Sequence, residues 1–168
     1  MAASTWGGLN LFSFGSDLRI EPISIPPGWN ERLLLFSTGI TRQASEPLAM
    51  QAEQMLEYVD DLTKAAESAA WVAWSILQGR TPELGWCLHS AWQDKRRLPG
   101  VTTPAIDHAY DAARNAGAAG GKLCGAGGGG YLLFYVEPDA QASVRTAMAE
   151  LQLTELPFHL TTDGARMI

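Results

Sequence analysis

The amino-acid sequence predicts an α+β domain, in which an antiparallel or mixed sheet is covered by helices on one side. Runs of β-type sequence lie toward the two ends of the chain, and segments with helical periodicity occupy its middle. The chain has 168 residues, of which 46% are hydrophobic. This is enough to bury one good-sized core, so one compact unit is expected.

The first forty residues are expected to form a hairpin and then one buried strand. "GLNLFSF" and "RIEPISI" are β-type runs separated by the turn-rich "GSDL", so residues 8–25 are predicted to form a hairpin. Pro22 in the second run indicates an edge strand. After the "PPG" break, "RLLLFSTG" (32–39) is a continuous apolar run, which suits a strand buried on both faces.

The middle of the chain predicts three or four helices. Apolar residues spaced by three and four from about residue 44 to 78 predict a long helix with one buried face. Threonine-proline pairs, which start helices, precede two more predicted helices at roughly 82–97 and 104–116. Gly117 is expected to end the last of them. Four helical tryptophans are expected to lie in the core: Trp71, Trp74, Trp86 and Trp92.

The last third of the chain predicts a strand, a helix and two short strands. After the glycine-rich "GGKLCGAGGGG" (120–130), "YLLFYV" has the aromatic and aliphatic content of a strand. "PDAQASVRTAMAEL" (138–151) predicts a helix that begins at its proline. "LPFHL" (156–160) and "ARMI" (165–168) are predicted to be closing strands.

Composition excludes several function classes. A net charge of −6 argues against binding to nucleic acid or to an anionic membrane, although "KRR" at 95–97 is a local concentration of positive charge. No window is long and apolar enough to span a bilayer. The two cysteines form no C-x-x-C pair and the three histidines are scattered, so no metal site is predicted and a reduced, cytoplasmic location is expected.

The glycine loop at 125–130 formally satisfies G-x-G-x-x-G. A dinucleotide site needs a strand before this motif and a helix after it, whereas here a helix is predicted before it and a strand after it. Two interpretations remain: a tight turn that packs against a helix, or backbone N–H groups that converge on an anion. Ordering four consecutive glycines costs backbone entropy, which favours the second. The candidate positions are Gly125, Ala126, Gly127, Gly128 and Gly129.

Three basic residues are candidates for phosphate binding. Lys95 lies at i+7 and i+11 from Leu88 and Leu84, so it continues the apolar stripe of its predicted helix. It must therefore either reach an anion or extend to solvent at the helix C-terminus. Arg42, after the buried strand, is placed either to clamp a phosphate or to lie exposed where the next helix begins. Lys122, directly before the loop, is the third candidate.

The sequence resembles the GHMP kinases, the superfamily of galactokinase, homoserine kinase, mevalonate kinase and phosphomevalonate kinase. The glycine loop is similar to the third conserved motif of that superfamily. The resemblance continues in order along nearly the whole chain and is closest to the D-glycero-D-manno-heptose 7-phosphate kinase branch. The segments that carry it are "WGGLNLFSF", "LLLFSTGITRQASE", "LHSAWQDKRRL", "IDHAYDAARNAGAAGGKLCGAGGGG" and "PFHLTTDGARMI".

This resemblance implies a fold, a reaction and a ligand. The fold would be the GHMP kinase C-terminal domain, with a ferredoxin-like core. The complete enzyme would use ATP and Mg to phosphorylate heptose 7-phosphate. Enzymes catalyse phosphoryl transfer mainly by positioning the reactants and by placing positive charge near the transferred group. The loop and Lys95, which lies in a W-x-x-K segment similar to one in the heptose kinases, would contact the sugar phosphate.

The resemblance also implies a missing front half. Family members carry an ATP loop of the form G-x-G-x-x-S-S-A and a catalytic Asp in a Gln-Asp-Gln context, neither of which occurs in these 168 residues. The base is therefore expected upstream of Met1. Residues 1–43 would be a hairpin and strand continuing from a missing N-terminal domain, and 44–168 would be the C-terminal domain.

Two explanations of the short chain remain open. One is a truncated or internally started kinase. The other is a stand-alone sugar-phosphate-binding or regulatory half-domain, without catalysis, that pairs with another chain. On either explanation, we expect the chain alone to show no kinase activity and no tight binding of ATP or Mg. An exposed apolar face is expected to bind the missing half or to cause self-association.

Overall fold

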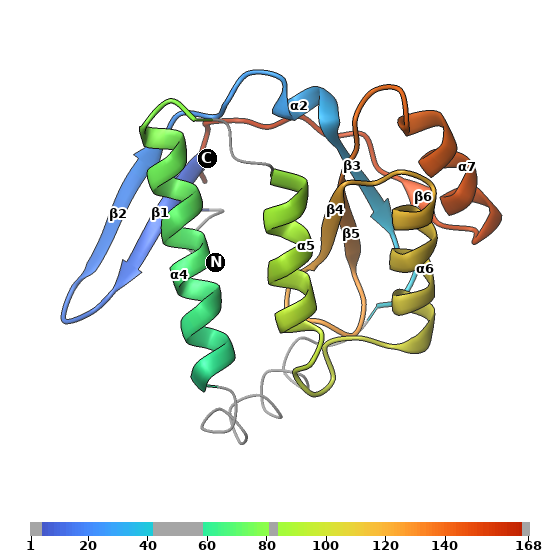
Figure 1. Ribbon diagram of the computed structural model, residues 1–168, viewed down its shortest axis with the longest axis horizontal. Helices are drawn as coiled ribbons and strands as arrows, with labels where there is room; N and C mark the ends of the chain where they lie inside the picture. The colour runs from blue at the N-terminus through green and yellow to red at the C-terminus, as the bar shows by residue number, and fades with distance from the viewer. Residues whose placement is uncertain (1–4, 42–58, 81–83, 166–168) are drawn as a thin grey trace.

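The computed structural model describes residues 5–41, 59–80 and 84–165. They form the predicted α+β arrangement (Figure 1). A four-stranded antiparallel sheet has the strand order β4-β5-β3-β6, and β1 and β2 form a separate two-stranded hairpin. The elements are β1 (Leu9–Phe14), β2 (Leu18–Ile23), α2 (Trp29–Arg32), β3 (Leu33–Ser37), α4 (Val59–Leu77), α5 (Leu84–Lys95), α6 (Pro104–Asn115), β4 (Gly120–Cys124), β5 (Tyr131–Tyr135), α7 (Gln141–Glu150) and β6 (Thr154–Glu155).

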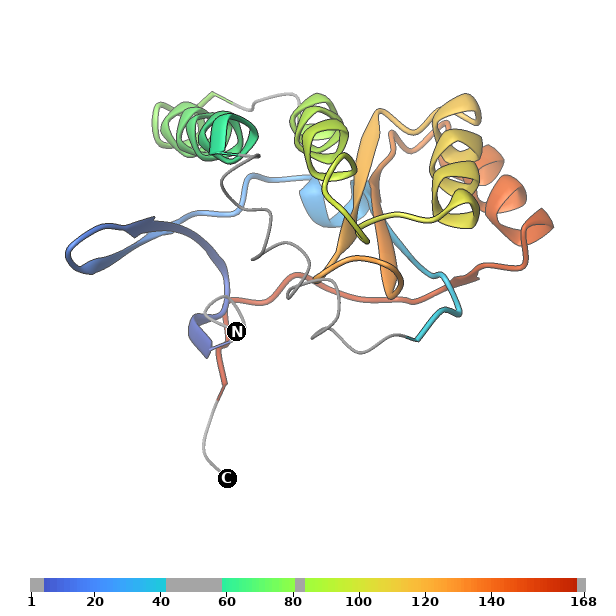
Figure 2. The same cartoon turned by 90° about the horizontal axis from the view of Figure 1, so that it is seen from below.

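The predicted hairpin at the start of the chain is confirmed. β1 and β2 pair antiparallel from Leu9 opposite Ile23 to Phe14 opposite Leu18. Figures 1 and 2 place this hairpin and α4 on one side of α5, with the sheet, α6 and α7 on the other. The Gly8 N–H donates to the carbonyl of Thr161 (3.0 Å), which joins the start of the hairpin to the C-terminal segment.

The main core lies between one face of the sheet and helices α6 and α7, and it includes the buried Trp92 of α5. β3 contributes Leu34 and Phe36, which are buried, whereas Leu33, Leu35 and Ser37 are only half-buried. The prediction that this strand is buried on both faces is therefore wrong, because only alternate side chains of a strand point toward the same helical layer. The remaining core residues are Trp92, Val101, Ile106, Ala109, Tyr110, Ala113, Ala118, Leu123, Leu132, Phe134, Val136, Val144 and Met148.

The largest difference from the prediction lies at residues 120–124. The sequence places them in the loop between a helix and a strand, but they form strand β4. β4 pairs antiparallel with β5 from Gly120 opposite Tyr135 to Cys124 opposite Tyr131. Glycine is a poor strand former, so the side-chain pattern gave no sign of this strand. The glycines serve close packing, because a Cβ at Gly120 would overlap the Gly85 carbonyl of α5. The glycine loop therefore connects two strands, and no helix follows it.

The C-terminal segment also differs from the prediction. The expected strand at 156–160 is absent from the described residues, and pairing with β3 is limited to Thr154 and Glu155 of β6. The Leu156 N–H still donates to the Leu35 carbonyl (2.8 Å), but Pro157 has no N–H to continue the ladder. The predicted strand at 165–168 lies largely outside the described residues.

The helices follow their sequence signals closely where they are described. Thr103 caps α6, accepting a hydrogen bond from the Ile106 N–H at 3.3 Å, and Gly117 follows the helix with a φ of 112°. Residues 44–58 of the predicted long helix lie outside the described part of the chain. None of the described helices is long and apolar enough to cross a membrane.

The tryptophan prediction is wrong for three of four residues. Trp92 is fully buried, but Trp71, Trp74 and Trp86 are 50%, 49% and 58% exposed. Trp71 and Trp86 line an apolar groove of about 410 Å³ between α4 and α5. A hydrophobic residue on a helix needs a neighbouring element to bury it, and the described residues place none over this face.

Candidate anion-binding site at the glycine loop

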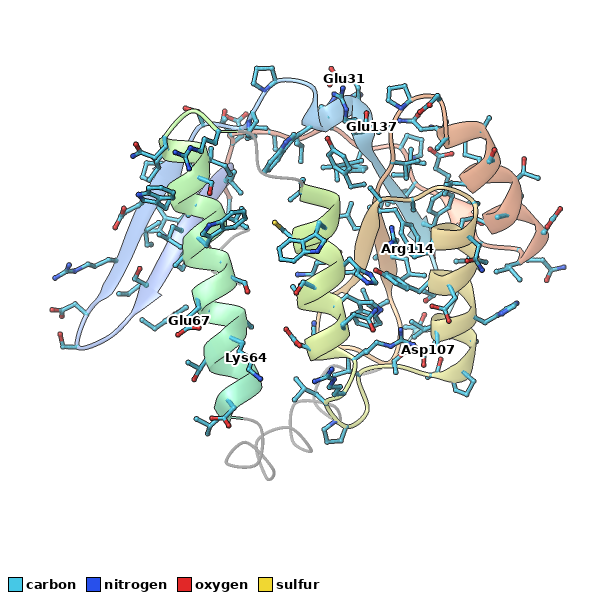
Figure 3. All side chains as sticks on the ribbon, in the orientation of Figure 1. Glu31, Lys64, Glu67, Asp107, Arg114 and Glu137 are labelled. Carbon is cyan, nitrogen blue, oxygen red and sulfur yellow. The ribbon has the colours of Figure 1, made fainter. Side chains whose placement is uncertain are left out.

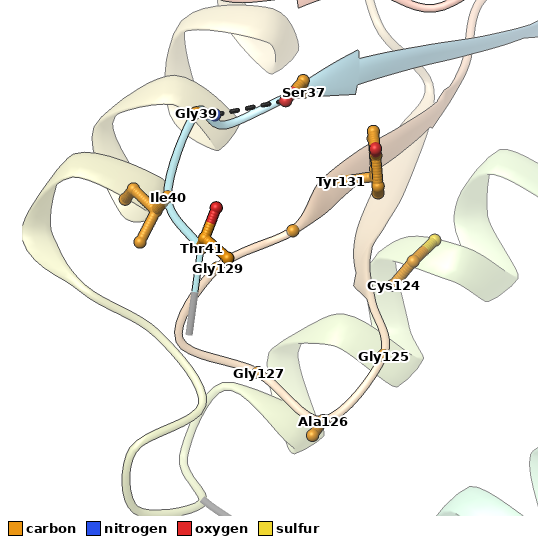
Figure 4. Close-up of a pocket in the computed structure, with 11 residues that line it drawn as sticks. Ser37, Gly39, Ile40, Thr41, Cys124, Gly125, Ala126, Gly127, Gly129 and Tyr131 are labelled. Atoms are coloured by element: carbon orange, nitrogen blue, oxygen red, sulfur yellow. Dashed lines mark hydrogen bonds between the residues drawn. The ribbon is translucent and has the colours of Figure 1, made fainter. Parts of the chain in front are cut away.

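The glycine loop and the segment after β3 enclose a pocket of about 340 Å³ (Figure 4). The sheet brings them together, since Ser37 at the end of β3 pairs with Tyr131 at the start of β5. The chain that leaves β3 therefore runs beside the loop that leads into β5. The pocket is lined by Ser37, Gly39, Ile40, Thr41, Cys124, Gly125, Ala126, Gly127, Gly129, Gly130 and Tyr131.

Two of the loop glycines are required by close backbone contacts. Gly127 has a φ of 117°, and a Cβ added there would lie 2.6 Å from the Cα of Val101. On the opposite side, a Cβ at Gly129 would lie 2.5 Å from the carbonyl oxygen of Ile40. Real Cβ atoms do not approach other atoms so closely, so the loop lies between Val101 and Ile40 only because it lacks side chains.

The loop also forms backbone hydrogen bonds with these two neighbours. The Gly128 N–H donates to the Val101 carbonyl (2.8 Å), and the Gly130 N–H donates to the Ile40 carbonyl (3.0 Å). Gly128, one of the predicted ligand positions, accordingly does not line the pocket. Within the described ranges, the N–H groups of Gly125, Gly127 and Gly129 have no acceptor, so they remain available to a ligand.

Lys95 reaches the loop directly. Its Nζ donates a hydrogen bond to the Gly125 carbonyl at 2.6 Å, from the last residue of α5. The side chain is half-buried. Burial lowers the pKa of Lys95, and the positive charge of Lys122 lowers it further, while Cys124 acts in the opposite direction. The charge of Lys122 therefore opposes the charged form of Lys95.

The neighbouring thiol remains an ordinary packed cysteine. Burial raises the pKa of Cys124, and the charges of Lys122 and Lys95 only partly offset this effect. A raised pKa keeps the thiol protonated and a poor nucleophile.

The structure brings most of the predicted site residues together. Lys95 contacts the loop at the Gly125 carbonyl, whereas Lys122 lines a separate pocket with Leu88 and Ala91 of α5, from which its charge still acts on Lys95. Arg42 lies outside the described residues, although Thr41 before it lines the pocket. The sequence prediction missed Ser37, Thr41 and Tyr131, and the signal that could have found the first two is "STGIT", a hydroxyl-rich stretch directly after a buried strand.

This arrangement is suited to an anion. No carboxylate lies among the described residues that line the pocket, three of its lining glycines have N–H groups without an acceptor, and Lys95 reaches the Gly125 carbonyl beside it. Backbone amides and ammonium groups both bind phosphate groups. Among the described lining residues there is no carboxylate of the kind that commonly binds Mg²⁺.

Comparison with known proteins identifies the family of this fold. The family model described as GHMP kinases C terminal matches residues 72–152. A curated relative, the D-glycero-alpha-D-manno-heptose 7-phosphate kinase of Campylobacter jejuni, is 25% identical over 177 aligned positions, which cover 98% of this chain and 51% of the relative.

Solved structures agree on the fold. A putative sugar kinase from Campylobacter jejuni has a TM-score of 0.66 at 23% identity, over 96% of this chain and 48% of its own. The L. major mevalonate kinase, solved in complex with R-mevalonate, has a TM-score of 0.70 at 20% identity, over 89% and 47%. The chain thus spans about half the length of the relatives that it matches.

Proposed function

This chain belongs to the GHMP kinases through its C-terminal domain at residues 72–152, and from this premise we propose that it forms the substrate-binding side of a heptose 7-phosphate kinase. The complete enzyme would transfer the γ-phosphoryl group of ATP to the sugar phosphate. The division into residues 1–43 and 44–168, a cytoplasmic location and the absence of nucleic-acid partners are further parts of this proposal.

The observation that carries the proposal is the Lys95 ammonium held at the Gly125 carbonyl beside Lys122. Burial and the like charge of Lys122 both oppose the charged form of Lys95, so the position is unfavourable for a lysine that serves stability alone. Charged groups held in unfavourable surroundings beside a pocket are typical of functional sites. A phosphate bound between the two lysines would relieve their repulsion.

Each part of the site then has a role. Lys95 and Lys122 would bind the phosphate of the sugar substrate by charge-assisted hydrogen bonds, and Arg42 is a further candidate for the same anion. The N–H groups of Gly125, Gly127 and Gly129 would hold phosphate oxygens in the pocket. The hydroxyls of Ser37 and Thr41 would contact the sugar or phosphate oxygens.

ATP and Mg fit this site unequally. The loop N–H groups suit the phosphates of ATP. The described pocket residues supply no carboxylate for Mg, so we assign no step of the reaction to a metal held by them. The residues of this chain would bind the anion, orient it and balance its charge. These are the main requirements of phosphoryl transfer.

Calorimetric titration of the 168-residue chain tests the binding role. We expect heptose 7-phosphate to bind at least roughly tenfold more tightly than the unphosphorylated heptose. The unphosphorylated sugar cannot form the charge-assisted hydrogen bonds of the phosphate. ATP, titrated separately, is expected to bind weakly. Equal affinity for the two sugars would show that the lysines do not hold the phosphate and would overturn the assignment.

A turnover assay tests the kinase role. The chain alone is expected to show no transfer from ATP to heptose 7-phosphate. We expect transfer to be restored when the unmatched part of the Campylobacter jejuni kinase is added to this chain. The control is the Lys95→Met variant of the chain, which should not restore transfer. Sugar-phosphate binding with no transfer in any combination would favour a non-catalytic binding module instead.

A further inference from the structure

The segment between α5 and α6 holds the glycine loop from outside the pocket. Val101 in this segment is fully buried. Its carbonyl accepts a hydrogen bond from the Gly128 N–H at 2.8 Å, and its Cα lies 2.6 Å from the position that a Cβ of Gly127 would take. The middle of the loop is therefore shaped by the position of one residue of a different segment.

One carboxylate oxygen fixes that segment at both of its ends. Asp107 lies in the first turn of α6 (Figure 3). Its Oδ1 is 2.6 Å from the guanidinium of Arg96, the first residue of the segment, and accepts a 2.8 Å hydrogen bond from the hydroxyl of Thr102, which follows Val101. Arg96 and Asp107 are only 22% and 30% exposed. Shielding from solvent makes such a charge-assisted pair stronger than an exposed one.

The loop needs this support because its own residues cannot provide it. Glycine has access to a wide range of backbone conformations, and no side chain in residues 127–130 restricts them. The contacts to Val101 and Ile40 must therefore hold the loop in a single shape. A free N–H binds an anion well only if it is already oriented, since ordering it on binding costs conformational entropy.

We propose that Arg96 and Asp107 are positioning residues for the anion site, which act through Val101 to hold Gly127 and Gly128 in the shape that presents the neighbouring N–H groups to the ligand. This inference rests on the proposed function for the identity of the ligand, but the effect on the loop does not depend on it. The loop is then held in place at two points near the end of α5. Lys95 bonds to Gly125 directly, and Arg96 acts through Asp107 and Val101.

Substitution of Asp107 with a matched control tests the inference. Asp107→Ala removes both hydrogen bonds, and Asp107→Asn keeps an acceptor for Thr102 but loses the charge. Asp111→Asn is the control, because Asp111 is more exposed and 4.0 Å from Arg96. The readouts are amide hydrogen exchange of Gly128 by NMR, with the core amide of Phe134 as reference, and the affinity for heptose 7-phosphate.

The expected result is selective release of the loop. Asp107→Ala should speed Gly128 exchange and weaken heptose 7-phosphate binding, each by about tenfold or more, with Phe134 exchange unchanged. For Asp107→Asn, the Gly128 exchange rate and the affinity for heptose 7-phosphate should lie between those of Asp107→Ala and the wild type. Asp111→Asn should change neither readout.

Two outcomes would overturn the inference. One is Gly128 exchange that stays at the wild-type rate in Asp107→Ala. The other is Gly128 and Phe134 exchange that rise together in both Asp107 variants, which would show a general structural role. If Gly128 exchange rises selectively but neither variant nor wild type binds heptose 7-phosphate, the positioning role stands and the proposed function fails.

Discussion

The Lys95 ammonium donates a 2.6 Å hydrogen bond to the Gly125 carbonyl, so the last residue of α5 is joined directly to the first residue of the glycine loop. The bond uses the charge of a half-buried lysine whose pKa is lowered by burial and by Lys122. Burial and the charge of Lys122 oppose the charged form of Lys95, and the proposed anion site depends on this feature.

Lys95→Met should therefore separate binding from stability. We expect the affinity for heptose 7-phosphate to fall by about tenfold to a hundredfold, since a hydrogen bond to a charged group is lost. The free energy of unfolding should change by less than about 1 kcal/mol, because the lost hydrogen bond is offset by relief of an unfavourable charge.

The matched control for Lys95 is Arg97→Met, at an exposed cation two residues away. Calorimetry and urea unfolding of both variants check the prediction. Similar losses of affinity in the two variants would mean that only the general positive field matters, and a large loss of stability in Lys95→Met would mean that Lys95 serves the fold.

Alanine substitutions at two loop glycines should differ in their effect on stability. Gly125 and Gly127 both have positive φ, of 86° and 117°, so alanine costs about 1–2 kcal/mol of backbone strain at either position. Only Gly127 also faces a backbone neighbour, the Val101 Cα, whereas a Cβ at Gly125 meets nothing within 4 Å. We expect Gly127→Ala to cost about 1–3 kcal/mol more than Gly125→Ala. Urea unfolding followed by tryptophan fluorescence measures this difference, and equal costs would contradict the packing of the loop against Val101.

The stability of the fold should fall in acid through His89. Its Nδ1 lies 2.8 Å from the Tyr110 hydroxyl, where a neutral imidazole can accept a hydrogen bond. Burial lowers the pKa of His89 below its ordinary value of 6.5, as do the charges of Arg114 and Arg96, while Asp111 opposes them. The unfolded chain then binds the proton first, so the free energy of unfolding falls as the pH drops through 6.5 and levels off below the folded-state pKa.

His89→Gln should reduce this dependence, and His108→Gln, at an exposed position, is the control. Urea unfolding above and below pH 6.5 provides the comparison. A pH dependence that survives unchanged in His89→Gln would assign the acid sensitivity to other groups.

The exposed groove between α4 and α5 should cause the isolated chain to self-associate. Trp71 and Trp86 line it and are half-exposed or more, so water contacts two large apolar side chains side by side. We expect a concentration-dependent increase in mass by sedimentation, reduced in the double variant Trp71→Gln/Trp86→Gln. Trp6→Gln is the control, since Trp6 is 58% exposed but does not line the groove. A monomer at high concentration in the unmodified chain would contradict the expectation.

Periodicity was sufficient to predict the elements that carry side-chain patterns. The hairpin, α6 with its Thr103 cap, α7 and β5 lie where local residue choice placed them, because caps and apolar spacing are short-range signals. The same reasoning singled out Lys95, since a lysine that continues an apolar stripe is visible in the sequence alone, and the structure shows its bond to Gly125. It failed for Trp71, Trp74 and Trp86, because burial depends on what packs against a helix and not on the helix itself.

The sequence by itself therefore determined the α+β class and the family resemblance, and it singled out the glycine loop, Lys95 and Lys122 as candidates for phosphate binding. Only the tertiary structure decided that β4 pairs with β5, that Ser37 and Thr41 line the pocket, and that Val101 supports the loop. The physical reason is that these contacts are made by backbone atoms of residues far apart in the chain. Glycine has no side chain whose pattern could report such a neighbour, so its partners become known only when the chain is folded.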